Sequence, residues 1–147
     1  MSWDVAAGAS CLIMLGWLVV TEWVPLSPLN DLEASTPGER LRAAAGNYTV
    51  LLAIAVAVAT GTAVGAILAE LLAVAWLIGH VLAWWLPYLG HSAESQREAY
   101  RREYSRTLKI LPTDGHDVVV DVQHMVVGLL TLPMVAFVTL HAVAALS

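Results

Sequence analysis

The sequence predicts an all-α fold, an integral membrane bundle of four transmembrane helices with a short amphipathic interfacial helix. Of the 147 residues, 59% are hydrophobic and only 13% are charged, against roughly 25% charged residues in an ordinary soluble domain. The apolar residues form long runs, and about 20 such residues match the roughly 30 Å hydrocarbon layer of a bilayer. Because the backbone must satisfy its own hydrogen bonds in lipid, such runs become helices. We therefore expect one transmembrane domain over residues 1–147.

The first two spans are separated by a polar, proline-containing loop. The first span is expected over about residues 5–24 and ends before Pro25. The N-terminus carries no basic residue, so it lacks the start of a secretory signal, and we expect this span to be retained. The loop covers residues 25–42, and within it Thr36, Pro37 and Glu39 indicate the start of a helix. The second span is expected over about 43–60.

The next apolar stretch is too long for one helix. Residues 43–89 are 47 residues, which would reach about 70 Å as a single helix. The break is expected in the turn-forming residues 60–65, which gives a third span over about 66–88. Gly61 and Gly65 also form a G-x-x-x-G pattern, which would allow close helix contact. A second loop, residues 89–117, leads to a last span over 118–146, where Pro133 predicts a kink.

The basic residues predict the orientation. All seven lie in the two longer loops, which four spans place on the same side of the membrane: Arg40, Arg42, Arg97, Arg101, Arg102, Arg106 and Lys109. By the positive-inside rule both loops face the cytoplasm, and both termini lie outside. We expect a multi-pass protein of a bacterial plasma membrane.

The second loop predicts an amphipathic helix over about 93–110. Ser95 and Glu98 fit a capping box, and Tyr100, Tyr104 and Leu108 repeat every four residues. A lipid headgroup would be bound by the basic and aromatic side chains of this segment, namely Arg101, Arg102, Arg106, Tyr100 and Tyr104. The alternative is that the basic residues only set the topology and attract anionic lipids in general.

Ionisable residues within spans are costly, so they are the candidates for function. Counted from the loop ends, every span has a polar residue at a similar depth, and a four-helix bundle can turn such residues toward one another. The predicted catalytic set is His80, Asp121, His124, Glu22 and Asn47. In this set a histidine would act as acid and base, oriented by Asp121. Near the outer end, Glu70 and His141 are expected to pair with each other.

A divalent metal is a second possibility for the same cluster. Asp117, Asp121 and His124 follow the i, i+4, i+7 spacing of one helix face. With His80 they would supply the oxygen and nitrogen ligands suited to zinc or iron. The alternative is structural, because Asp117 and Asp121 near a helix start also complement its dipole. The sequence does not choose among these, and it identifies no cofactor.

Two stretches resemble known families. Trp84-Trp85-x-Pro87-Tyr88, then Tyr104-x-x-Thr107-x-x-x-Leu111-Pro112-x-x-Gly115, then His124, resembles a group of small uncharacterised four-span bacterial membrane proteins. The resemblance implies that the second loop and His124 act together. The stretch Glu39-Arg40-x-Arg42-Ala43-Ala44-Ala45-Gly46-Asn47 is faintly similar to the membrane-associated glutathione and eicosanoid enzymes. It departs from them at Val50, where that family has a glutamate, and in the spacing of Arg42 to Asn47.

Two functions are therefore open. One is an enzyme that acts on a lipid-soluble substrate in a polar His/Asp pocket on the cytoplasmic side. The other is a non-catalytic accessory subunit, a small oligomeric transporter or a lipid-binding protein. Expected partners are membrane lipids and either further copies of the chain or a membrane subunit. No phosphate-binding, zinc-protease or hydrolase motif occurs, and the basic loop is too small and too acidic to indicate nucleic acid.

Overall fold

The computed structural model describes residues 2–147, and the regular secondary structure of these residues is helical. The elements are α1 (Trp3–Trp23), the 3-10 turn η1 (Leu32–Ala34), α2 (Pro37–Ala59), α3 (Ala63–His80), the π-helical η2 (Val81–Trp85), α4 (Leu86–Tyr88), α5 (Glu94–Glu103) and α6 (Val122–Leu146). α3, η2 and α4 follow one another without a break. They form one span, Ala63–Tyr88.

Four of these segments are long and apolar enough to cross a membrane, namely α1, α2, Ala63–Tyr88 and α6. Their mean hydropathies lie between 1.6 and 2.1. The protein is therefore a multi-pass membrane protein, and the predicted four-helix fold is confirmed.

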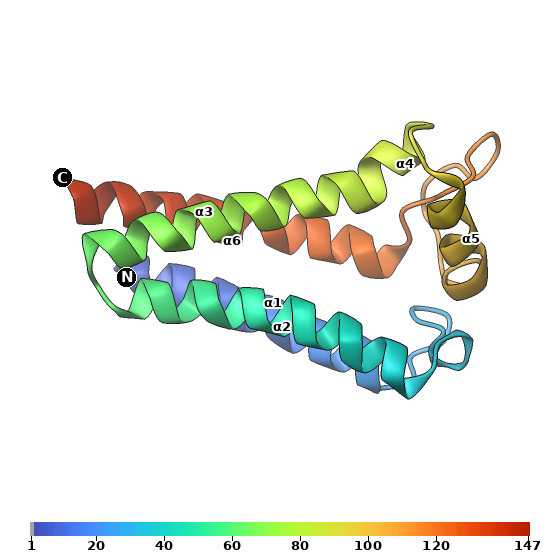
Figure 1. Cartoon of the computed structure of the whole chain (residues 1–147), viewed down its shortest axis with the longest axis horizontal. Coiled ribbons are helices and arrows are strands. Elements are labelled where there is room, and N and C mark those ends of the chain that lie inside the picture. The colour runs from blue at the N-terminus through green and yellow to red at the C-terminus, as the bar shows by residue number, and fades with distance from the viewer. Residues whose placement is uncertain (1) are drawn as a thin grey trace.

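The helices run antiparallel in chain order (Figure 1). α1 packs against α2 and α6, and α3 packs against the same two helices. Both termini and the turn between α2 and α3 lie at one end, which we call the turn end. The loops and α5 lie at the other, which we call the loop end. The two pairs α1/α2 and α3/α6 are closer together at the turn end than at the loop end.

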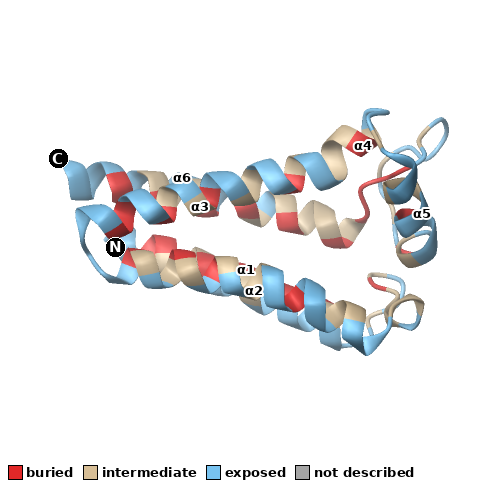
Figure 2. Ribbon diagram, in the orientation of Figure 1, coloured by how far each residue is buried: buried red, intermediate tan, exposed pale blue. Residues whose placement is uncertain are grey.

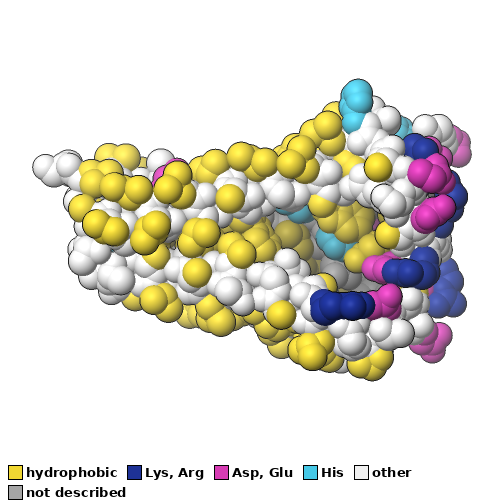
Figure 3. All heavy atoms as spheres, viewed as in Figure 1, with side chains coloured by type: hydrophobic (Ala, Val, Ile, Leu, Met, Phe, Trp, Pro, Cys, Tyr) yellow, Lys and Arg dark blue, Asp and Glu magenta, His cyan; other side chains and the backbone are white. Residues whose placement is uncertain are grey.

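The distribution of buried and charged residues matches the arrangement of the helices. The buried residues face between the helices, while the outer faces are exposed (Figure 2). The core includes Met14, Ile54, Ala69 and Met134, each 0% exposed. The lipid-facing surface keeps many large apolar side chains exposed, and the charged side chains gather at the loop end (Figure 3).

The second helix begins where its capping residues predict. Thr36 and Glu39 form a capping box, and Pro37 occupies the first turn. The helix is therefore longer than the apolar run 43–60, which marked only its membrane-embedded part. The predicted turn is also present. Gly61 has φ +61, and Gly65 lies in α3 against the end of α2, so the two glycines serve the turn and the close contact respectively.

The last span begins at Val122 and not at residue 118, so its predicted start is wrong. Val118, Val119 and Val120 are buried but not helical, and α6 begins at Val122 with Asp121 as its N-cap. The backbone N–H of Val122 donates to Leu108 O at 2.9 Å, which ties this segment to the preceding loop. Asp117 therefore lies outside the helix, and the predicted single face of Asp117, Asp121 and His124 is wrong.

The amphipathic helix is shorter than predicted. α5 ends at Glu103, and its N-cap is Ala93 with no side-chain hydrogen bond, so the predicted capping box at Ser95 is not formed. Tyr100 is buried against Val118 and Val119. Leu108 lies beyond the helix. α6 is helical on both sides of Pro133, and the kink there stays a prediction.

Candidate functional site

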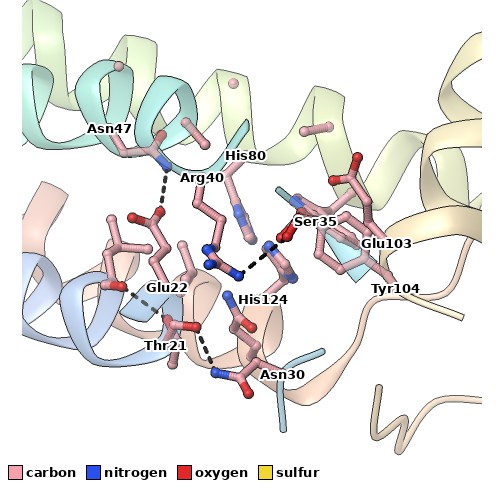
Figure 4. A pocket seen from close by; sticks show the side chains of 18 of the residues that line it. Thr21, Glu22, Asn30, Ser35, Arg40, Asn47, His80, Glu103, Tyr104 and His124 are labelled. Carbon is pink, nitrogen blue, oxygen red and sulfur yellow. Dashed lines mark hydrogen bonds between the residues drawn. The ribbon is translucent and has the colours of Figure 1, made fainter. Parts of the chain in front are cut away.

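A cavity of about 630 Å³ lies between the two helix pairs at the loop end. This volume falls within the roughly 300–1,000 Å³ of small-molecule sites. The hollow is visible from the side in Figure 3, and Figure 4 shows the polar side chains that line it. All four spans contribute, and the predicted residues that line it are Glu22, Asn47, His80 and His124. Asp121 does not line the cavity but lies directly behind His124.

The contact between Asp121 and His124 organises one wall of the cavity. Asp121 is 0% exposed, and its Oδ1 accepts from the His124 backbone N at 2.9 Å and contacts His124 Nδ1 at 2.7 Å. Its Oδ2 accepts from Thr107 Oγ1 at 2.8 Å. Burial raises the pKa of Asp121, but the hydrogen bonds from His124 and Thr107 outweigh it and bring the pKa below 3.8. The carboxylate is therefore ionised, and it orients Nδ1–H of His124 toward itself.

Two aromatic side chains fix the ring of His124. Trp84 stacks on it with ring centroids 3.6 Å apart, and Tyr104 contacts it edge-on at 5.2 Å. Burial raises the pKa of Tyr104, so its phenol stays neutral. Both aromatic residues also line the cavity. Since Nδ1 faces Asp121, the second ring nitrogen of His124 is the one available to a bound molecule.

His80 lies on the neighbouring helix and is 8% exposed. Its Nε2 has no hydrogen-bond partner among residues 2–147. A Cβ added at Gly128 would lie 2.8 Å from this nitrogen. Glycine at position 128 is thus what allows the imidazole of α3 to approach α6.

Two further polar atoms are buried at the cavity without a partner in the described chain. Glu22 Oε1 accepts from Asn47 Nδ2 at 3.4 Å, but Glu22 Oε2 has no partner. Arg40 Nη1 donates to the carbonyl oxygens of Leu32 and Ser35, at 2.6 and 3.4 Å, while its Nε has no partner. A carboxylate oxygen and a guanidinium N–H of two cavity-lining residues are thus without a partner in the described chain.

The predicted metal set is not assembled. Asp117 is an exposed loop residue whose carboxylate lies 3.8 Å from Arg97 Nε. Asp121 uses both oxygens for Thr107 and His124. Within residues 2–147, no three His, Cys, Asp or Glu side chains lie close enough to hold a metal ion. The expectation that His80, Asp117, Asp121 and His124 form one such group is therefore corrected.

The predicted headgroup residues point to separate partners. Arg106 makes a bidentate ion pair with Asp31 at 2.6 and 2.9 Å. Arg102 pairs with Glu103 and lies 3.4 Å from Glu39. Arg101 lies 3.6 Å from Glu94. In this arrangement each of the three guanidinium groups lies at a different carboxylate. Of the two tyrosines, Tyr104 turns toward the cavity and Tyr100 toward the protein core.

The pair expected at the turn end, Glu70 with His141, is not formed. Glu70 accepts from Thr139 Oγ1 at 2.9 and 3.1 Å rather than pairing with His141. His141 is 7% exposed, and its Nε2 has no partner among the described residues.

Sequence reasoning missed three residues of the site. Arg40 was counted only as a topology signal, although it lies seven residues before Asn47 on the same helix face. Trp84 and Thr107 entered through the resemblance to small bacterial membrane proteins, and Thr107 also fell within the predicted amphipathic helix 93–110. The helical spacing of Arg40 and Asn47 was a usable signal. The contacts of Trp84 and Thr107 depend on how the second loop folds back onto α6.

Comparisons with family models, curated proteins and solved structures give no match to this chain. The sequence resemblances therefore stay predictions, and the geometry of the cavity is the guide to function.

Proposed function

We propose that this protein is a membrane-embedded enzyme that performs acid–base chemistry on a lipid-soluble substrate held in the loop-end cavity. The observation that carries the proposal is the buried Asp121–His124 pair beside a cavity with free polar atoms. Asp121 accepts from Nδ1–H, so the neutral ring presents the lone pair of its Nε2 as a base. An imidazole can both accept and donate a proton, which suits acid–base chemistry.

The surroundings support a role in chemistry as well as in packing. Trp84 and Tyr104 hold the ring of His124 in one orientation, and a positioned base needs such support. The π-helical turn η2 directly follows His80 and contains Trp84, and π turns are frequent at functional sites. A structural N-cap alone would account for Asp121, but not for the cavity on the far side of the histidine.

The proposed setting is a bacterial plasma membrane with the loop end in the cytoplasm. Its support is the position of the seven basic residues, all of which lie at or near the loop end. The substrate would then react near the inner face of the bilayer. Membrane lipids are the proposed partners.

The test is turnover of lipids by the purified protein in nanodiscs made from a bacterial polar lipid extract, followed by mass spectrometry. The wild-type protein is expected to convert at least one lipid species. His124→Ala should slow this by about 10²–10⁴-fold, the usual contribution of a general base. Asp121→Asn should also slow it, because the amide no longer accepts from Nδ1–H as a carboxylate does.

His91→Ala is the matched control, since His91 is exposed in the second loop and does not line the cavity. It should turn over lipid like the wild type. Full turnover in both His124→Ala and Asp121→Asn contradicts their roles. Lipid that co-purifies with the wild type but never changes contradicts the enzyme, and favours a lipid-binding protein.

A further inference from the structure

The cavity opens sideways between α2 and α3. Its walls include Ala43, Gly46 and Asn47 on α2, and Ala75 and Gly79 on α3. These two helices are joined at the turn end and diverge toward the loop end (Figure 1), and the hollow in Figure 3 lies between them. On the span formed by α3 and η2 the lining runs from Leu72 to Trp84, which is about 18 Å of helix. The cavity wall therefore extends along more than half of the roughly 30 Å hydrocarbon layer.

The lining changes from polar to apolar with depth. On each span an apolar lining residue lies closer to the turn end than the polar one. The pairs, polar residue first, are Glu22 and Leu18, Asn47 and Val50, His80 and Leu72, and His124 and Val127. The polar part is thus at the loop end, and the apolar part lies deeper in the bilayer. This gradient fits an amphiphile whose head lies at the histidines and whose chain lies toward the turn end.

The charged side chains at the polar part of the cavity determine which type of lipid headgroup would bind there. Four carboxylates line the cavity, those of Glu22, Asp31, Glu39 and Glu103. Arg40 is the one guanidinium among the lining residues. Three of the carboxylates have partners: Asp31 has Arg106, Glu39 has Thr36 and Glu103 has Arg102. Glu22 is the lining carboxylate that has no ion-pair partner among residues 2–147, so an anionic head such as a phosphate beside it would face a like charge, which is unfavourable.

Two buried polar atoms of lining residues lack a partner in the described chain, one an acceptor and one a donor. Glu22 Oε2 needs a donor, and Arg40 Nε–H needs an acceptor. Both belong to residues that line the cavity at its polar part, as Figure 4 shows. A hydroxyl group supplies a donor and an acceptor without adding charge, and it is also a group from which His124 could take a proton.

We propose that the ligand of this cavity is an uncharged, hydroxyl-bearing lipid of the monoacylglycerol or long-chain alcohol class, which enters from the bilayer between α2 and α3. The inference rests on the proposed function only in taking the cavity as the substrate site. The hydroxyl head contacts Glu22 and Arg40, and the acyl chain lies along Leu72 and Val50.

Substitutions at two glycines of the cavity wall would fill the cavity without a clash with the rest of the protein. A Cβ added at Gly46 or Gly79 meets nothing within 4 Å, and both residues line the cavity. Gly46→Leu and Gly79→Leu therefore place a side chain where the ligand would lie. Gly16→Leu is the matched control, because Gly16 also has open space around it and lies within a span, but does not line the cavity.

The experiment measures binding of tritiated 1-monooleoylglycerol to the full-length protein, immobilised in detergent, by scintillation proximity. Saturable binding is expected for the wild type and for Gly16→Leu. Gly46→Leu and Gly79→Leu should each weaken it by about tenfold or more. Unlabelled 1-oleoyl lysophosphatidate, which adds a phosphate to the same chain and glycerol, should compete at least about tenfold more weakly than unlabelled monooleoylglycerol. Thermal unfolding of each variant shows that it is folded.

Three results would overturn the proposal: no saturable binding by the wild type, unchanged binding in both glycine variants, or equal competition by lysophosphatidate. The readout separates this inference from the proposed function. Selective binding without any lipid turnover contradicts only the enzyme. Turnover that persists in both glycine variants contradicts only the ligand and its route.

Discussion

The two ends of the bundle use small residues in opposite ways. At the turn end, a Cβ added at Gly65 would overlap Thr60 Oγ1 and lie 2.5 Å from the backbone oxygen of Ala57. At the loop end, a Cβ added at Gly46 or Gly79 meets open space. At one end a missing side chain lets two helices touch, and at the other it leaves room between them. The difference indicates that the turn end holds the bundle together and the loop end is kept open.

The residues of α3 show how one helix serves both purposes. Ala66, Ala69 and Ala73 are each 0% exposed and pack closely at the turn end. Farther along, Gly79 and Ala83 line the cavity instead. α3 and α2 separate toward the loop end (Figure 1), where Trp84 and Tyr104 line the cavity between them.

The largest expected effect is at Gly65. Gly65→Ala should lower the free energy of unfolding by about 1–3 kcal/mol, the usual cost of forcing an extra group into a packed site. The matched change Gly79→Ala should leave stability unchanged or raise it, because alanine favours a helix over glycine by about 1 kcal/mol. Thermal unfolding of both variants in detergent measures this. Equal melting temperatures for the two variants would contradict the inference that Gly65 is tightly packed while Gly79 faces open space.

The next effect is at the N-cap of α6. Asp121→Ala should cost about 0.5–2 kcal/mol, because the backbone N–H of His124 loses its acceptor. Asp121→Asn keeps an acceptor there and should cost less. If Asp121→Ala unfolds at the wild-type temperature, the capping contact does not stabilise the helix.

The lowered pKa of Asp121 predicts that the stability of the protein depends on pH. The pKa of Asp121 is lowered on folding, so its contribution to stability is complete above its ordinary value of 3.8 and is lost as the pH falls below that value. Asp121→Asn has no such group. Its melting temperature should therefore decline less steeply than that of the wild type between about pH 4 and pH 2. Parallel acid-side curves would contradict this linkage.

Gly128 predicts a local effect. Gly128→Ala places a Cβ 2.8 Å from His80 Nε2, so the imidazole must move. Because the atom that gives way is the far end of a side chain, the fold should persist. The ring signals of His80 in a histidine-labelled sample should shift while those of His91 stay the same. An unchanged His80 signal would show that the two helices are not packed as described.

The smallest effect is expected at the ion pair between the loops. Arg106 is exposed, although its partner Asp31 is only 12% exposed. Arg106→Ala should lower the melting temperature slightly, and the difference from the wild type should shrink as salt is added, since exposed pairs are screened. A large loss that ignores salt would mean that the pair has a role beyond surface charge.

The fold could be predicted well from sequence, and the site only in part. The four spans follow from apolar runs whose lengths match the bilayer, and the start of α2 follows from Thr36, Pro37 and Glu39. The shared depth of Glu22, Asn47, His80 and His124 follows from counting along each span. These features depend on local pattern and helix geometry, both of which the sequence carries directly.

The rest depends on contacts between distant segments. Val118–Val120 looked like the start of a helix, but they are not helical: Val118 and Val119 pack against Tyr100, and the bond from Val122 N–H to Leu108 O ties the adjacent chain to the loop. This moved Asp117 out of the predicted ligand set. Arg40 shares a helix face with Asn47, but its contacts with the carbonyl oxygens of Leu32 and Ser35 depend on how the first loop folds.

The most direct test of the account is the protonation state of the two ring nitrogens of His124, measured by NMR on protein with ¹⁵N-labelled histidine. The account predicts that in the neutral ring Nδ1 carries the proton and Nε2 is free. Asp121→Asn should lose that preference, and His91 should be unaffected by the substitution. A neutral His124 with its proton on Nε2 in the wild type would contradict the account, because the nitrogen facing the cavity would then not be a base.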